Sequence, residues 1–150
     1  MTSTVGCVQP SYMPWIPFFK RFINCDYFVI LDDADYSKNS NQNRNYINMD
    51  NAKNLLTVPV HYKSKCPINQ IKIDNTKNWK KKHYKSILQA YNKSKFFHSF
   101  QDGLEDIYKK EWNSLFQLNL EIINFFKAYF NIKKKLYISS ELNLTGYGNE

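Results

Sequence analysis

Glycine is scarce in this chain, with four residues among 150. None of them falls in the spacings G-x-G-x-x-G, G-x-x-x-x-G-K-[ST] or G-x-S-x-G, which present backbone N–H groups or a nucleophile to a substrate. The sequence therefore excludes the common glycine-rich phosphate loops. Any phosphate site must use side chains or the N-terminus of a helix.

Cysteines and long apolar runs are also few. Cys7, Cys25 and Cys66 are odd in number and widely separated, which matches neither a zinc-binding spacing nor a disulfide framework. No apolar run reaches 18 residues, and the N-terminal segment lacks the cationic start and apolar block of a secretory signal. We therefore expect a cytoplasmic protein with free thiols and no membrane span.

Arginine is also scarce, since only Arg21 and Arg44 occur among 21 basic residues. A planar guanidinium binds a carboxylate or phosphate through two parallel hydrogen bonds, which an ammonium group does not. Arg44 lies in the polar segment QNRN at 42–45. We predict that it holds the anionic group of a ligand; the alternative is a structural salt bridge or a turn-fixing contact.

Positive charge is concentrated in the middle of the chain. Residues 37–95 contain thirteen basic and two acidic side chains, whereas the segments on either side are slightly acidic. Such a segment suits an anionic partner, which could be a phosphate compound, a nucleotide or a nucleic acid. The alternative is a solvated lysine face, and the run WKKKHYK at 79–85 in a predicted helix fits that alternative.

Proline and aromatic residues crowd the stretch CVQPSYMPWIPFF at 7–19, which holds three of the five prolines. Prolines lower the entropic cost of holding a loop in one shape. A loop of fixed shape suits a binding site, although the same residues could simply pack the loop against a core.

Apolar patterning predicts an α/β fold. A strand, a proline-rich loop, a helix and a buried strand follow one another at the N-terminus, which is a βαβ unit. We expect a small, mainly parallel or mixed sheet, followed by a helical C-terminal half. The predicted strands cover 4–10, 26–33, 46–49, 55–62 and 68–73, with a short strand and a turn in 133–142; the predicted helices cover 14–24, the region around 84–91, and 111–130.

Ligands of open α/β sheets bind beyond the carboxyl ends of the strands. The loop at 9–15 follows the first predicted strand, so we predict that it lies beside the loop at 42–45 and shares a site with it. The candidate substrate-binding residues are Gln9, Tyr12, Trp15, Asn43 and Arg44. The two rings would stack on a sugar or base, the amides would bind hydroxyl groups, and the arginine would bind the anion.

Carboxylates follow the second predicted strand. Alternation along the strand places Asp33 and Asp35 on one side and Asp32 on the other. We predict a catalytic role for Asp33 and a divalent metal, Mg²⁺ or Mn²⁺, held by Asp33 and Asp35. This D-x-D pattern looks like the metal motif of nucleotide-sugar glycosyltransferases, but capping, turn formation or solvation would also explain it.

His83 is the stronger of two candidate acid–base residues, the other being His61. The surrounding lysines would favour the neutral form of His83, as a general base requires. The alternative is a structural or solvated histidine.

The chain as a whole resembles the WbqC-like family of bacterial proteins. The residues that carry the resemblance are Gln9, Pro10, Tyr12, Pro14 and Trp15, then PFFKRF (17–22), DYFVILDDADYSK (26–38), QNRN (42–45), LTVPV (56–60), WKKKHYKSILQAY (79–91) and INFFKAYFNIKKKLYISSEL (123–142). Relatives in this family typically continue well beyond the SSEL turn. We therefore interpret residues 1–150 as a single WbqC-like domain that lacks a C-terminal part.

The family is associated with surface-polysaccharide clusters, including O-antigen synthesis. The resemblance therefore implies a bacterial protein of polysaccharide biosynthesis. We expect it to bind a small anionic, nucleotide-sugar-like compound and to act as a group transferase, without binding nucleic acid specifically. The alternatives are a non-catalytic nucleic-acid-binding protein that uses residues 37–95, or a scaffold protein of a polysaccharide assembly.

Overall fold

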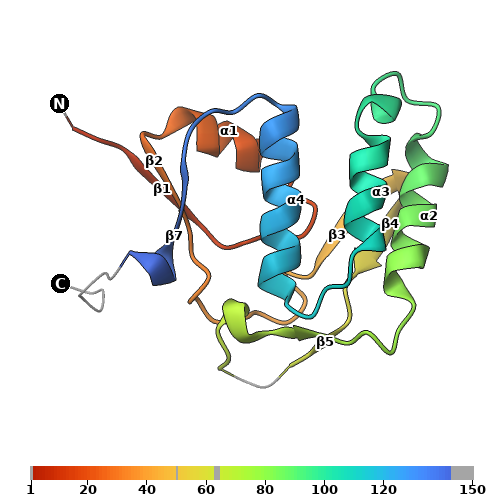
Figure 1. Cartoon of the computed structure of the whole chain (residues 1–150), viewed down its shortest axis with the longest axis horizontal. Helices are drawn as coiled ribbons and strands as arrows, with labels where there is room; N and C mark the ends of the chain where they lie inside the picture. The colour runs from red at the N-terminus through yellow and green to blue at the C-terminus, as the bar shows by residue number, and fades with distance from the viewer. Residues whose placement is uncertain (1, 50, 63–64, 143–150) are drawn as a thin grey trace.

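Helix α4 stands at the centre of the molecule in Figure 1, a computed structural model that describes residues 2–49, 51–62 and 65–142. A parallel sheet and α1 lie on one side of α4, and α2, α3 and the strands β3 and β4 lie on the other. The elements are β1 (Val5–Val8), α1 (Ile16–Asn24), β2 (Tyr27–Ile30), β3 (Arg44–Met49), β4 (Ala52–Thr57), β5 (Val60–His61), β6 (Lys72–Ile73), α2 (Trp79–Tyr91), α3 (Gln101–Lys109), α4 (Leu115–Tyr129) and β7 (Leu136–Ile138).

The predicted βαβ unit is confirmed. Strands β1 and β2 pair in parallel, with Val5 opposite Tyr27, and α1 forms the connection between them. Strand β7 pairs in parallel with the other edge of β2, so the sheet has the order β1-β2-β7. The last strand of the described chain therefore completes a sheet that the first residues begin, and all three carboxyl ends meet at one edge.

Helix α1 packs on one face of this sheet through aromatic side chains. Phe22 is fully buried and stacks on Phe28 of β2, with 4.2 Å between ring centroids. Gly6 lies under the same layer, where a Cβ atom would come within 2.9 Å of the Cys25 sulfur. Close packing of helix against sheet thus explains one of the few glycines. On the opposite face, the edge side chains Val5 and Tyr27 are exposed.

The strands outside this sheet form two antiparallel pairs, β3–β4 and β5–β6. The predicted strand at 68–73 is only partly correct, because Ile68–Gln70 forms a 3₁₀ turn and the strand is limited to β6. Ile68 and Ile71 are both buried. Their spacing of three residues places both in the core through a helical turn, which a continuous strand would not allow.

A larger core joins α2, α3 and α4 to the β3–β4 hairpin, and it includes Trp79, Ile87, Leu104 and Leu118.

Helix α4 begins at Leu115, later than predicted, because Ser114 acts as its N-cap and accepts a hydrogen bond from the N–H of Gln117. Helix α3 had not been predicted. No helix in the described part of the chain is long and apolar enough to cross a bilayer.

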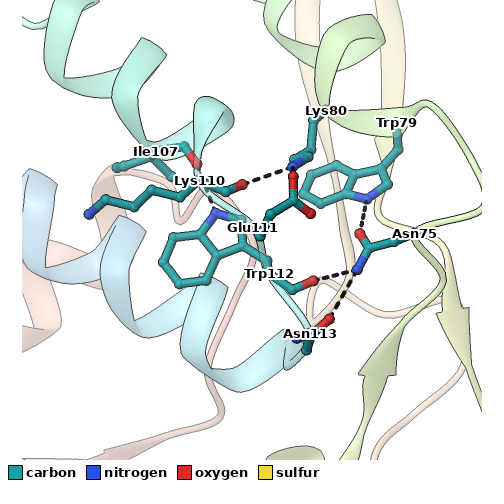
Figure 2. Close-up of polar contacts among 8 residues, drawn as sticks. All are labelled: Asn75, Trp79, Lys80, Ile107, Lys110, Glu111, Trp112 and Asn113. Carbon is teal, nitrogen blue, oxygen red and sulfur yellow. Dashed lines mark hydrogen bonds and ion pairs between the residues drawn. The ribbon is translucent and has the colours of Figure 1, made fainter.

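The start of α2 is tied to the connection between α3 and α4 (Figure 2). Asn75 donates to the carbonyl of Trp112 at 2.8 Å, and Lys80 donates to the carbonyl of Lys110 at 2.9 Å and to the Glu111 carboxylate at 2.5 Å. One lysine of the basic run is therefore part of a structural joint and is not a free surface cation.

Candidate functional site

The two loops predicted to share a site are in direct contact, so their predicted proximity is confirmed. The Gln42 side chain donates from Nε2 to Gln9 Oε1 at 2.9 Å. The backbone N–H of Tyr12 donates to the carbonyl of Asn41 at 2.9 Å, and Asn45 Nδ2 donates to the carbonyl of Met13 at 2.6 Å. These bonds fix the proline–aromatic loop against the segment that precedes β3.

A pocket of about 550 Å³ lies where these loops meet the carboxyl end of β1. This is the edge of the sheet at which α/β proteins bind ligands, and the volume suits a small molecule. The pocket is lined by Cys7, Val8, Gln9, Ser11, Trp15, Pro17, Phe18, Arg21, Leu31, Ser40, Asn41 and Gln42. Two of the predicted substrate-binding residues, Gln9 and Trp15, are among them.

Trp15 lies at the start of α1 and Arg21 in its last turn. Trp15 is the N-cap residue, and its side chain is 64% exposed, so its ring is free to stack on a ligand. Arg21 lies three residues after Phe18, on the same side of the helix. Within the described part of the chain, Arg21 has no hydrogen-bond or ion-pair partner. Among the described residues, the pocket therefore has one guanidinium without a partner.

Sequence reasoning missed Arg21 and Gln42 as site residues. The scarcity of arginine applied to Arg21 as much as to Arg44 and could have identified it. Gln42 is almost fully buried, and its role becomes visible only through its contact with Gln9.

Arg44 does not line the pocket. Its guanidinium donates to the side-chain oxygen of Asn39 at 3.2 Å and to the carbonyl of the same residue. Asn39 has a positive φ of 64°, in the left-handed region that Asn adopts more readily than most residues, and Arg44 supports this turn. These contacts favour the turn-fixing alternative; a ligand role for Arg44 stays a prediction.

Tyr12 and Asn43 are buried, which does not favour the predicted ligand contacts, and their role as substrate-binding residues stays a prediction. Tyr12 is 0% exposed, and its ring lies in the core. Asn43 donates from Nδ2 to the carbonyl of Val58 at 2.9 Å and thereby fixes the loop to the segment after β4. Both residues therefore support the loops from their buried side. Local spacing could not show this, because a loop side chain can point toward either the core or the solvent.

His83 is separated from the main pocket and belongs to a buried network. Its Nδ1 lies 2.8 Å from the hydroxyl of Tyr12, which also contacts the hydroxyl of Tyr108. Burial lowers the pKa of His83 from 6.5 to about 4, and a hydrogen bond with the Thr57 backbone opposes this shift. Burial also raises the pKa of Tyr12, an effect to which Tyr108 adds. His83 is therefore neutral, but through burial and not through the neighbouring lysines.

The predicted catalytic role of His83 stays untested, although its position favours a structural one. It lines a second pocket of about 290 Å³ together with Thr57 and Trp79, and it does not line the pocket of Gln9. A pKa of about 4 also makes its imidazole a weak base at neutral pH.

The carboxylates after β2 contact the 3₁₀ turn Ser139–Glu141, which follows β7. Asp32 is 2% exposed and accepts hydrogen bonds from Ser139 Oγ (3.0 Å), Ser140 N (3.0 Å), Ser140 Oγ (2.7 Å) and Asn69 Nδ2 (3.0 Å). Burial alone would raise the pKa of Asp32, but these hydrogen bonds outweigh it and hold the pKa below its usual value. Asp32 therefore clamps the ends of β2 and β7 together.

Asp33 and Asp35 are exposed, and Ser139 Oγ also contacts Asp33. Among the described residues, no group of three His, Cys, Asp or Glu side chains could hold a metal ion. A Mg²⁺ or Mn²⁺ ion at Asp33 and Asp35 would need water or substrate oxygens for most of its coordination. The metal role and the catalytic role of Asp33 stay predictions.

Comparison with known proteins agrees with the resemblance seen in the sequence. The chain is 32% identical over 143 residues to the uncharacterized protein Rv1507c of Mycobacterium tuberculosis. The alignment covers 93% of this chain and 62% of the relative, so the chain spans less than two thirds of that protein's length. No solved structure matches the chain significantly. Because the sequence profile of the WbqC-like protein family matches residues 9–150, the chain belongs to that family.

Proposed function

We propose that the pocket at the end of β1 binds a small anionic, nucleotide-sugar-like compound and that the protein acts as a group transferase in surface-polysaccharide biosynthesis. The family's association with polysaccharide clusters supports this pathway. The pocket supplies the type of ligand, because it combines an exposed indole, an unpaired guanidinium and several neutral hydrogen-bonding groups.

The observation that carries this proposal is the presence of Trp15 and Arg21 in one pocket at the carboxyl edge of the sheet. A sugar ring or a base can stack on the exposed indole, while the guanidinium binds a phosphate or carboxylate on the same compound. Gln9 and neighbouring side chains can bind hydroxyl groups.

The two arginines provide a direct test. Arg21→Gln removes the unpaired positive charge of the pocket, so we expect a loss of affinity of about tenfold to a hundredfold, which corresponds to about 1–3 kcal/mol for a charge-assisted hydrogen bond. The measurement is isothermal titration calorimetry with a panel that contains UDP-glucose, glucose 1-phosphate and glucuronate.

Arg44→Gln is the matched control, because it removes the same charge from a residue that contacts Asn39 and not the pocket. We expect it to lower the melting temperature slightly and to leave the affinity unchanged. If Arg44→Gln reduces the affinity and Arg21→Gln does not, the ligand role belongs to Arg44 as first predicted from the sequence.

Nucleic-acid binding remains the alternative to test. Trp79 is buried and Lys80 is held in the joint with Glu111, so the basic helix offers exposed lysines such as Lys81 and Lys85 but no exposed indole. We expect weak binding to short oligonucleotides that disappears near physiological salt, as simple neutralisation of phosphates would give. Fluorescence titration across a salt series measures this. Tight binding that persists at such salt concentrations would instead favour a nucleic-acid-binding function.

A further inference from the structure

The hydrogen-bonding direction of the Gln9 side chain is fixed by its neighbours. The backbone N–H of Ser37 can only donate, and it donates to Gln42 Oε1 at 2.8 Å. The Gln42 amide nitrogen is therefore the group that faces Gln9, and it donates to Gln9 Oε1 at 2.9 Å. This chain of bonds engages the carbonyl oxygen of Gln9 and leaves its two N–H bonds for a ligand.

Burial makes this arrangement rigid. Gln42 is 2% exposed, and its own backbone N–H donates to Ser40 Oγ at 3.3 Å. Reversing the amide of Gln42 would place two N–H groups against the N–H of Ser37 and leave buried donors unpaired, which is costly. Gln42 is thus a positioning residue that presents Gln9 to the pocket as a donor.

The charge of the pocket also favours an anionic ligand. Among the residues that the structure describes, its lining contains no Asp or Glu, and Arg21 is the one charged side chain there. Mg²⁺ is bound in proteins mainly through carboxylate oxygens together with substrate phosphates. A pocket without carboxylates lacks the groups that would hold a metal-chelated diphosphate, whereas Arg21 and the Gln9 amide can bind an oxyanion directly.

From these observations we infer that the pocket recognises a sugar-sized oxyanion directly, through Arg21 and through the Gln9 amide that Gln42 orients, with no bridging metal ion. The ligand class is a sugar acid or a sugar monophosphate, whose carboxylate or phosphate accepts these hydrogen bonds while its ring lies on Trp15. This inference rests on the proposed function, since it specifies the ligand of the same pocket.

The thiol of Cys7 provides a readout inside the site. Cys7 lines the pocket and is exposed, whereas Cys25 is buried and Cys66 is half-buried. The rate at which iodoacetamide alkylates Cys7, followed by peptide mass spectrometry, therefore reports occupancy of the pocket. The probes are glucuronate, glucose 1-phosphate and neutral glucose, each added in EDTA and in Mg²⁺.

We expect glucuronate or glucose 1-phosphate to slow alkylation of Cys7 equally in EDTA and in Mg²⁺, and glucose to have no effect. The anion that protects at the lower concentration identifies the group as a carboxylate or a phosphate. Protection that requires Mg²⁺ would overturn the inference and leave the proposed function standing. If neither anion protects Cys7, the inference fails; the proposed function fails as well only if UDP-glucose also shows no binding in the calorimetric titration.

Substitution of Gln42 tests the orientation of Gln9. In Gln42→Glu, one carboxylate oxygen can still accept from Ser37, and the other accepts from the amide nitrogen of Gln9, which turns the Gln9 carbonyl toward the ligand. We expect at least a tenfold loss of affinity for the protecting anion. Gln89→Glu, at an exposed position of α2, makes the same change in charge and should bind as the wild type does.

A second variant keeps the test decisive if Gln42→Glu fails to fold. Gln9 is exposed, so Gln9→Glu introduces no buried charge, and its carboxylate can still accept from Gln42. It removes the donors and adds a negative charge to the pocket, so we again expect at least a tenfold loss. Unchanged affinity in the folded variants would show that Gln9 does not bind the anion and would overturn the inference.

Discussion

Asp32→Asn is expected to lower the melting temperature by about 10 °C. The substitution preserves the shape of the side chain but removes its charge and turns an NH₂ group toward Ser139, Ser140 or Asn69, all of which donate to the carboxylate. Hydrogen bonds to a charged group contribute about 1.5–3 kcal/mol each, and an unpaired buried donor adds a further cost. A total loss of about 3 kcal/mol gives this shift for a domain of this size.

The adjacent carboxylate is the matched control for this experiment. Asp33 is exposed, and within the described part of the chain its one hydrogen bond is with the hydroxyl of Ser139, so Asp33→Asn should change the melting temperature by less than about 2 °C. Differential scanning fluorimetry of both variants at neutral pH gives the comparison. Equal melting temperatures for Asp32→Asn and the wild type would show that Asp32 does not clamp the sheet.

Stability is expected to fall as the solution is acidified from pH 6.5 to pH 4, because of His83. Its pKa is lowered to about 4 in the folded protein and is near 6.5 in the unfolded chain. Between these values the unfolded chain binds a proton that the folded protein does not, so the stabilisation is complete above pH 6.5 and is lost as pH falls. At 1.36 kcal/mol per pKa unit, His83 accounts for about 3 kcal/mol of this loss.

His83→Gln tests the assignment, because glutamine can still bond with Tyr12 but does not titrate. Urea unfolding at intervals between pH 7 and pH 4.5 should show a clearly shallower pH dependence for this variant. The matched control is His98→Gln, which replaces an exposed histidine outside the buried network. A slope that is unchanged in His83→Gln would mean that another group causes the acid sensitivity.

The sequence predicted the βαβ unit and the position of the pocket because both depend on strong local signals. A short apolar strand that ends at Pro10, an amphipathic helix and a second apolar strand leave few alternative topologies. The carboxyl edge of a parallel sheet then gives the location of the site. The contact between Gln9 and Gln42 agrees with this location.

The direction in which individual side chains point could not be predicted from the sequence. Tyr12 lies between two pocket residues in the loop, yet its ring enters the core and meets His83 and Tyr108. Of the two scarce arginines, Arg44 at the start of β3 turns back to Asn39, and Arg21 of α1 lines the pocket. Tertiary packing decides these directions, and no local pattern encodes them.

The pairing of β7 with β2 has a consequence for synthesis on the ribosome. Asp32 and Ser140, which clamp the two strands, are 108 positions apart, so β2 emerges from the exit tunnel long before its second partner. During most of translation one edge of β2 is therefore an unpaired strand edge, which is the kind of surface that invites aggregation. Closing so long a loop is also slow. The nascent chain should consequently depend on chaperones until β7 has been made.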